Sequence, residues 1–147
     1  MKILKFISSL LVIILCNFAQ AHNYLERNYK LEKVQPKVSI ITSIYDGDDF
    51  IAQFLSDITR QTIFEQTELI LINANSPGNE EPIIKEYMKK FPNIVYKKLD
   101  KDPGLYAVWN IAIKLAKSDF ITNANLDDRR NPESLEKQLK ALEENPN

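Results

Sequence analysis

One polar cluster of this sequence is best suited to chemistry, and two adjacent aspartates lie at its centre. Asp127 and Asp128 follow a short apolar segment, with Asn125 just before them and Arg129 and Arg130 directly after them. Carboxylate and amide oxygens are the hard ligands that Mg2+ or Mn2+ prefers, and guanidinium groups pair with phosphate oxygens. The cluster could therefore hold a divalent cation and a diphosphate. It could equally be an Asp-rich turn before a capped helix, because Asp and Asn favour turns in any protein.

A second acidic cluster contains Asp46, Asp48 and Asp49. Paired aspartates after a strand could serve as a phosphatase nucleophile, but that chemistry needs a hydroxyl residue next, where Phe50 stands. We predict instead that these acids are the cap and first-turn charges of a helix, whose dipole favours them. The sequence has no dinucleotide-binding glycine motif, phosphate-binding glycine loop or His-Glu-x-x-His, which argues against a dehydrogenase, a P-loop nucleotidase and a zinc protease.

The overall charge argues against a nucleic-acid partner. Of 147 residues, 19 are Lys or Arg and 20 are Asp or Glu, which gives a formal net charge of -1 without a basic block. A content of 44% hydrophobic and 27% charged residues is typical of one globular domain.

The N-terminus has the pattern of a secretory signal peptide, residues 1–21. Lys2 and Lys5 precede an apolar run at 10–16, and Ala-Gln-Ala at 19–21 fits a cleavage site. The alternative is an uncleaved segment that keeps the protein on the membrane, but the run is far shorter than the roughly 20 residues that span a bilayer. Cleavage would make His22 the first residue of an exported chain and remove the single cysteine, which excludes disulfides and thiol catalysis.

The elements that must position these polar residues alternate between two kinds of segment. Short β-branched runs predict strands, and apolar residues at helical spacing predict helices. Asn79 and Asn131 are the expected caps of the second and fourth helices. The predicted strands are 38–43, 68–74, 94–98 and 120–123, and the predicted helices are 50–61, 80–91, 105–116 and 132–143.

This order predicts an α/β fold with a mostly parallel sheet and helices on both faces. Ligands of such sheets bind beyond the carboxyl ends of the strands. Four loops meet there, 44–49, 75–79, 99–104 and 124–131, so we expect Tyr45, Asn75 and Asp127 to surround one crevice. One face of the third helix should carry its apolar residues, Leu105, Val108, Trp109, Ala112, Ile113 and Ala116. One edge of the sheet should be unpaired and prone to association.

Four motifs in order resemble the family 2 glycosyltransferases of the GT-A fold. They are PKVSIITSIY at 36–45, Gln-Thr at 61–62 followed by ELILINANSPGNE at 68–80, GLYAVWNIAI at 104–113 and FITNANLDDRRNPESL at 120–135. The resemblance covers the nucleotide-binding half of that family. It implies an N-terminal extension at 22–36 and a partial, apparently truncated, glycosyltransferase domain at 37–147.

The resemblance also implies roles for individual residues. Ser43 and Tyr45 would line the base and ribose pocket. Asn73 or Asn75 would stand near the position where the family usually has an aspartate that contacts the base, which is a departure from the family pattern. Asn110 matches an asparagine of the third helix, whereas Trp109 replaces a frequent arginine and is better explained as a core aromatic.

For the metal motif, the resemblance places Asp127 as the most direct ligand of Mg2+ or Mn2+, Asn125 in place of the first aspartate and Asp128 as the acid that follows. Arg129 or Arg130 would help to neutralise the leaving diphosphate.

The implied reaction transfers a sugar from a nucleotide diphosphate sugar to a hydroxyl of an unidentified glycan, lipid or protein. The catalytic base of the family follows the metal loop, and no carboxylate of this chain is assigned to it. Two alternatives are a non-catalytic nucleotide-sugar binding module and an exported α/β protein whose acidic loop is only a turn.

Overall fold

The computed structural model describes residues 20, 22 and 35–145. The chain divides into two units, residues 1–34 and 35–147, and the architecture below is that of the second unit. The predicted signal peptide lies outside the described residues apart from Gln20, and the predicted extension is described only at His22, Gln35 and Pro36. Every helix within the described part of the chain is too short or too polar to cross a membrane.

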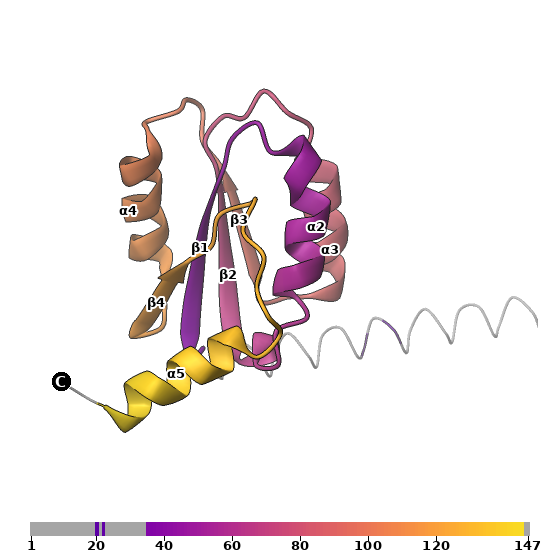
Figure 1. Ribbon diagram of the computed structural model, residues 1–147. Helices are drawn as coiled ribbons and strands as arrows, with labels where there is room; N and C mark the ends of the chain where they lie inside the picture. The colour runs from indigo at the N-terminus through magenta and orange to yellow at the C-terminus, as the bar shows by residue number, and fades with distance from the viewer. Residues whose placement is uncertain (1–19, 21, 23–34, 146–147) are drawn as a thin grey trace, which may run out of the picture. The chain divides into compact units, whose positions relative to one another are not determined.

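Four parallel strands form the sheet, in the order β3-β2-β1-β4 (Figure 1). The strands are β1 (Val38–Ile44), β2 (Thr67–Asn73), β3 (Ile94–Lys98) and β4 (Phe120–Asn123). The parallel sheet confirms the predicted fold class, and β3 and β4 have the predicted bounds. β3 and β4 are the two edges of the sheet among the described residues, and association through an edge stays a prediction.

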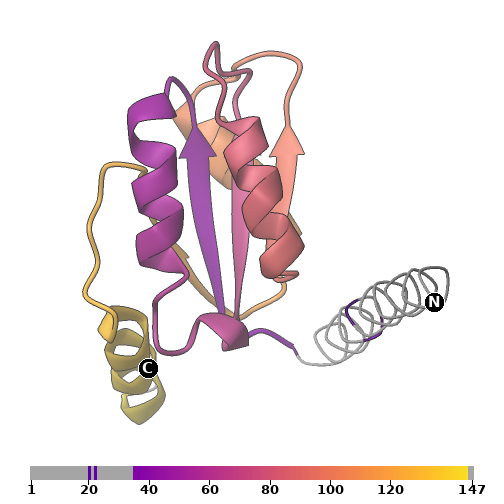
Figure 2. The ribbon, with the colours of Figure 1, turned by 90° about the vertical axis from the view of Figure 1, so that its right-hand side faces the viewer.

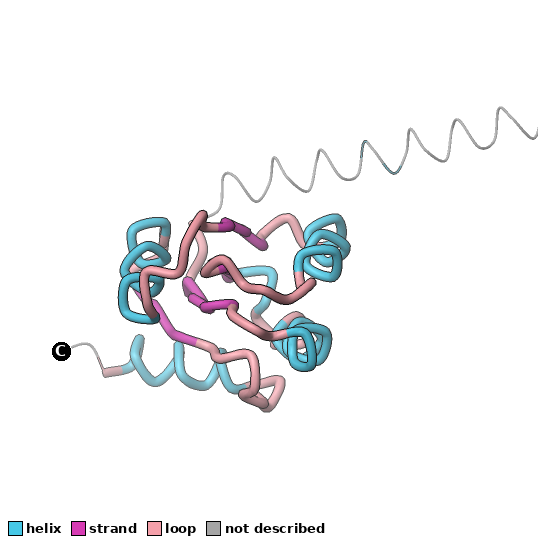
Figure 3. The backbone as a smooth tube through the Cα atoms, turned by 90° about the horizontal axis from the view of Figure 1, so that it is seen from above, coloured by secondary structure: helices cyan, strands magenta, loops and turns pink. Residues whose placement is uncertain are grey.

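Helices cover both faces of the sheet, as expected (Figures 2 and 3). Helices α2 (Asp48–Ile58) and α3 (Glu81–Lys90) lie on one face, and α4 (Leu105–Leu115) lies on the other. A short 3-10 helix, η1 (Phe64–Gln66), precedes β2. Helix α5 (Ser134–Glu144) lies near the amino ends of the strands.

Alternating side chains of the buried strands fill a separate core on each face. Ile40 and Ile44 of β1 belong to the cluster under α2 and α3, whereas Ile41 belongs to the cluster under α4. Successive residues of a strand point to opposite faces, so a strand that is covered on both sides needs a nearly continuous apolar run. β2 is buried at every position for this reason.

The predicted caps of α2 and α3 are wrong. Helix α2 begins at Asp48, two residues before the predicted start, with Gly47 at the N-cap and no side-chain cap. Asp48 and Asp49 do supply the predicted first-turn charge. Helix α3 has Glu80, not Asn79, at its N-cap and no side-chain cap. The Asp48 carboxylate accepts the backbone N–H of Asn79 at 2.7 Å. Contacts between loops, which local sequence does not encode, fix both helix starts.

The predicted start of the fourth helix is also wrong. Asn131 accepts the N–H of Glu133 at 3.1 Å in a turn, and α5 begins only at Ser134. This turn is held from outside, because the Gln61 side chain donates to the Asn131 carbonyl at 2.9 Å and accepts the N–H of Leu135 at 3.1 Å. Gln61 therefore anchors the chain where it returns from the acidic loop.

Helix α4 buries a narrower face than the sequence predicted. Val108 and Ala112 are fully buried, and Trp109 packs against them as the predicted core aromatic. Leu105 and Ile113 are 47% and 45% exposed, so only part of the predicted apolar face is buried. Leu105 is the first residue of the helix, and Ile113 follows Ala112 around the helix axis, away from the contact with the sheet.

Candidate functional site

A surface depression of about 240 Å³ lies where β1 ends and the acidic loop after β4 begins. Ser43, Tyr45 and Asp127, three of the predicted site residues, line it together. Parallel pairing of β1 with β4, from Val38 opposite Phe120 to Ile41 opposite Asn123, brings these distant segments to the same end of the sheet. The remaining lining residues are Asp46, Gly47, Phe50 and Leu126.

The turn after β1 is held by the loop after β2. The Ser76 hydroxyl accepts the N–H of Asp46 at 2.9 Å, and the Glu80 carboxylate accepts the N–H of Gly47 at 2.8 Å. Ser76 also donates its own hydroxyl hydrogen to Glu80 at 2.6 Å. Asp46 has a φ of 49°, in the left-handed region that side chains other than glycine seldom adopt. These hydrogen bonds stabilise that turn conformation.

Glu80 is fully buried at the start of α3 and acts as an anion. Burial alone would raise the pKa of this carboxyl. The hydrogen bonds from Ser76 and Gly47 and the positive charge of Lys98 outweigh burial and hold the pKa below the ordinary value of 4.5. One carboxylate oxygen, Oε1, accepts both hydrogen bonds, while Oε2 is buried without a protein partner among the described residues.

Gly47 also supports the acidic loop. A Cβ atom at this position would overlap Leu126 Cδ1, so the Leu126 side chain packs directly on the Gly47 backbone. Leu126 is only 8% exposed, whereas Asp127, the next residue, is exposed at the depression. The apolar side chain thus fixes the loop, and the carboxylate faces solvent.

The neighbouring polar residues of the acidic loop have different surroundings. The Asp128 carboxylate accepts the N–H of Asn125 at 3.2 Å, and the Asp128 N–H donates to the Asn125 carbonyl at 3.2 Å. Asp128 lines two other surface cavities and not the depression. Asp128 therefore closes the loop on itself, and Asp127 projects from the closed loop.

The two arginines that follow make contacts outside the depression. Arg129 Nε lies 3.5 Å from the Asp57 carboxylate on α2, and Arg130 donates to the carbonyl of Asn123. Neither arginine lines the depression. Their role toward a diphosphate stays a prediction.

Asn125, predicted as a metal ligand, and the three asparagines predicted to contact the nucleotide do not line the depression. Asn73 is 2% exposed, and its side-chain oxygen accepts the N–H of Ser76 at 2.8 Å, which shapes the loop after β2. Asn75 is exposed in that loop with a φ of 59°. Asn110 is exposed on α4. Contact between these residues and a nucleobase stays a prediction.

The oxygen donors at the depression suit a hard cation. Asp46 and Asp127 both line it, and carboxylate oxygens with phosphate oxygens and water are the usual ligands of Mg2+ and Mn2+. The described residues contain no group of three or more His, Cys, Asp or Glu side chains placed to hold a metal by themselves. A cation at this site would therefore need ligands from the phosphates as well.

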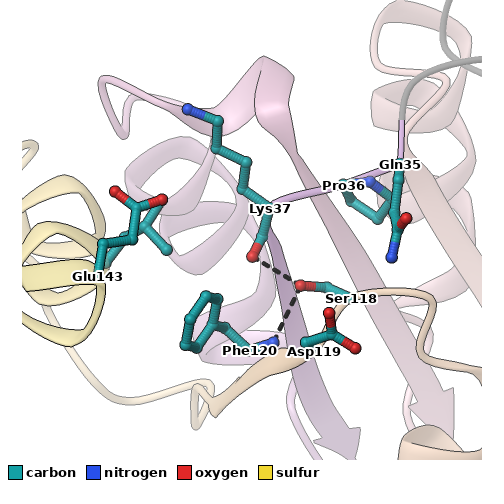
Figure 4. Close-up of a pocket in the computed structure, with 8 residues that line it drawn as sticks. Gln35, Pro36, Lys37, Ser118, Asp119, Phe120 and Glu143 are labelled. Atoms are coloured by element: carbon teal, nitrogen blue, oxygen red, sulfur yellow. Dashed lines mark hydrogen bonds between the residues drawn. The ribbon is translucent and has the colours of Figure 1, made fainter. Parts of the chain in front are cut away.

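A second pocket, of about 270 Å³, lies at the opposite, amino end of the strands (Figure 4). Its walls include Lys37, Asp119 and Phe120. Its central polar group is already satisfied, because the Ser118 hydroxyl donates to the Lys37 carbonyl at 2.6 Å and accepts the N–H of Phe120 at 3.1 Å. The Ser118 hydroxyl therefore holds a turn at the amino end of the sheet.

Sequence reasoning missed several residues of the site. Asp46, Gly47 and Phe50 were assigned only to a helix start, and Leu126 and Glu80 received no role. The one local signal was Gly47, a glycine between two aspartates at a strand end, because glycine lets another group approach the backbone closely. The partner of each residue lies in another loop, so these contacts are visible only in the folded chain.

Comparison with known proteins identifies the family of this chain. Residues 39–147 match the model for glycosyl transferase family 2. The minor teichoic acid biosynthesis protein GgaB of Bacillus subtilis is 35% identical over 111 residues, which cover 74% of this chain and 12% of that protein. The poly(ribitol-phosphate) beta-glucosyltransferase of Bacillus spizizenii is 32% identical over 101 residues, with coverages of 67% and 16%. This chain thus spans less than a fifth of the length of either relative.

Solved structures share the fold. S. aureus TarS 1-349 in complex with UDP-GlcNAc superposes with a TM-score of 0.69 at 24% identity, over 74% of this chain and 31% of that one. The mannosyltransferase PcManGT from Pyrobaculum calidifontis, in complex with GDP-Man and Mn2+, has a TM-score of 0.68 at 17% identity, over 92% and 43% of the two chains. The chain belongs to glycosyl transferase family 2, and its parallel sheet is part of a GT-A fold.

Proposed function

We propose that this chain binds a nucleotide diphosphate sugar in the depression and serves as the donor-binding part of a glycosyltransferase. The observation that carries the proposal is the meeting of Ser43, Tyr45 and Asp127 around one depression at the carboxyl end of a parallel sheet. Ligands of open α/β sheets bind at this end. The complexes of TarS with UDP-GlcNAc and of PcManGT with GDP-Man support a nucleotide-sugar donor.

Each lining residue has a role that fits its chemistry. Tyr45 and Phe50 are 54% and 42% exposed, and their aromatic faces offer a stacking surface for a nucleobase. The Ser43 hydroxyl can donate to or accept from the base or ribose. Asp127 would hold the cation, and Asp46 would add a second carboxylate within reach of it or of its water ligands.

GT-A glycosyltransferases commonly use a divalent metal, and we propose Mg2+ or Mn2+ here. When bound, the ion would neutralise charge on the diphosphate leaving group. Without it, the carboxylates of Asp46 and Asp127 repel a diphosphate. Metal and nucleotide should therefore bind with positive coupling. The acceptor would supply a hydroxyl group, from a glycan, a lipid or a protein.

Calorimetric titration of the chain with UDP and with GDP tests this proposal. We expect binding with Mn2+ and at least about tenfold weaker binding without it, a coupling typical of linked sites. Asp127→Asn should abolish the gain in nucleotide affinity that Mn2+ provides. The matched change Asp128→Asn, at the neighbouring loop-closing residue, should reduce nucleotide affinity less. Metal-independent binding, or an Asp127→Asn variant that titrates like the unmodified chain, would contradict the proposal.

For residues 1–21 we propose a cleaved signal peptide, on the sequence pattern alone. Cleavage predicts an intact mass that begins at His22 in protein isolated from its native host. A mass that includes Met1, in a membrane fraction, would instead support the uncleaved anchor.

A further inference from the structure

Glu80 connects two loops of the donor site without lining it. Its Oε1 atom accepts the N–H of Gly47 at 2.8 Å and the Ser76 hydroxyl at 2.6 Å, and Ser76 in turn accepts the N–H of Asp46 at 2.9 Å. The carboxylate is 0% exposed. One buried carboxylate is therefore bonded directly to the Gly47 amide and, through Ser76, to the Asp46 amide, both more than thirty residues earlier in the chain.

Those two amides belong to the turn that shapes the depression. Tyr45 precedes them, and Leu126, the neighbour of Asp127, packs on Gly47. If the turn moves away from Glu80, the Tyr45 ring and the Leu126 support move with it. A charged hydrogen-bond acceptor in a buried site is worth more than a neutral one, so this restraint is strong.

We propose that Glu80 is a positioning residue of the donor site, which holds the Asp46–Gly47 turn so that Tyr45 and Asp127 face the same depression. The expected effect on nucleotide affinity rests on the proposed function, whereas the effect on the turn does not. Glu80 does not line the depression, so in this proposal it contacts neither the nucleotide nor the metal.

The chain offers a matched control at the other end of the same sheet. Glu68 on β2 is also buried, at 5% exposure. Its Oε1 atom likewise accepts one serine hydroxyl, that of Ser39 at 2.6 Å, and one backbone N–H, that of Lys117 at 2.5 Å. Loss of Glu68 removes the same kinds of bonds far from the depression.

The test compares Glu80→Ala, Glu80→Gln and Glu68→Ala in the whole chain by amide hydrogen exchange and by titration with UDP and GDP in Mn2+. We expect Glu80→Ala to speed exchange at Asp46 and Gly47 by at least about tenfold beyond its effect on global unfolding, and to weaken nucleotide binding by a similar factor. Glu80→Gln keeps a carbonyl oxygen for both bonds and should restore most of each loss. Glu68→Ala should lower stability but leave exchange at the turn and nucleotide affinity within about twofold.

Equal effects of Glu80→Ala and Glu68→Ala on the turn and on affinity would overturn the inference, as would unchanged exchange at Gly47 in Glu80→Ala. If Glu80→Ala does not fold, Ser76→Ala replaces it. Of the two turn amides, only that of Asp46 loses its acceptor in Ser76→Ala, although the N–H of Gly78 and the Glu80 carboxylate also lose their bond to the hydroxyl. This variant should therefore speed exchange at Asp46 more than at Gly47, and equal exchange at both would count against the proposal. If the unmodified chain binds neither nucleotide, the proposed function fails, and the exchange comparison alone decides the role of Glu80.

Discussion

Asp127 and Asp128 are adjacent in the sequence, but the fold gives them different tasks. Asp128 accepts the N–H of Asn125 and closes the loop, while Asp127 is exposed at the depression beside Tyr45. Residue types and family motifs could predict the acidic loop and the aromatic side chain, because both are visible in local sequence. The role of Glu80 could not be predicted, because its partners lie in other loops and only the folded chain brings them together.

A pH dependence of stability follows from the lowered pKa of Glu80. Folding favours the ionised form, so this stabilisation is fully present above the ordinary pKa of 4.5 and is lost as the pH falls through the lower pKa of the folded state. Glu80→Gln lacks the titrating group. The difference in free energy of unfolding between the unmodified chain and Glu80→Gln should therefore shrink on acidification, as measured by urea unfolding at neutral pH and below pH 4.5. A difference in free energy of unfolding that stays constant on acidification would contradict this prediction.

At the scale of elements, periodicity located the strands better than the helix ends. The bounds of β3 and β4 were predicted correctly because short β-branched or apolar runs end at clear turn residues. The starts of α2, α3 and α5 were missed because the expected caps bind elsewhere: Asp48 accepts the Asn79 amide, and Gln61 holds the turn before α5. A local cap preference is worth about 1 kcal/mol, which contacts between elements readily override.

The junction of α2 with the acidic loop gives a sharp prediction. Gly47→Ala places a methyl group against Leu126, so we expect a loss of about 1–3 kcal/mol of stability and weaker Mn2+-dependent nucleotide binding. Combining it with Leu126→Ala should make the double variant less destabilised than the sum of the single changes, as urea unfolding can measure.

Gly104→Ala is the control for this junction. Gly104 has a φ of 87°, and no atom lies within 4 Å of the point that a Cβ atom would occupy, so the change should strain the backbone without touching the depression. It should lower stability and preserve nucleotide affinity. Additive effects of Gly47→Ala and Leu126→Ala, or unchanged affinity in Gly47→Ala, would show that this contact does not position the acidic loop.

For the whole molecule, the sheet order explains why one end carries the proposed site. All four strands are parallel, so the loops after β1, β2 and β4 leave the sheet at the same end (Figure 1). At the amino end, the Ser118 hydroxyl of the second pocket is bound in a turn (Figure 4). The alternation of strands and helices was enough to predict this polarity. The side chains that line the depression depended on loop packing, which periodicity does not encode.

The central claim is that a divalent cation and a nucleotide diphosphate bind together beside Asp127. The most direct measurement is paramagnetic broadening of backbone amide signals by Mn2+ in the presence of UDP or GDP, because this broadening falls steeply with distance from the ion. We predict that the amides of Tyr45, Gly47 and Asp127 broaden first, that those of Ser118 and Asp119 at the opposite end do not, and that Asp127→Asn abolishes the effect. Broadening centred elsewhere, or unchanged by Asp127→Asn, would contradict the claim.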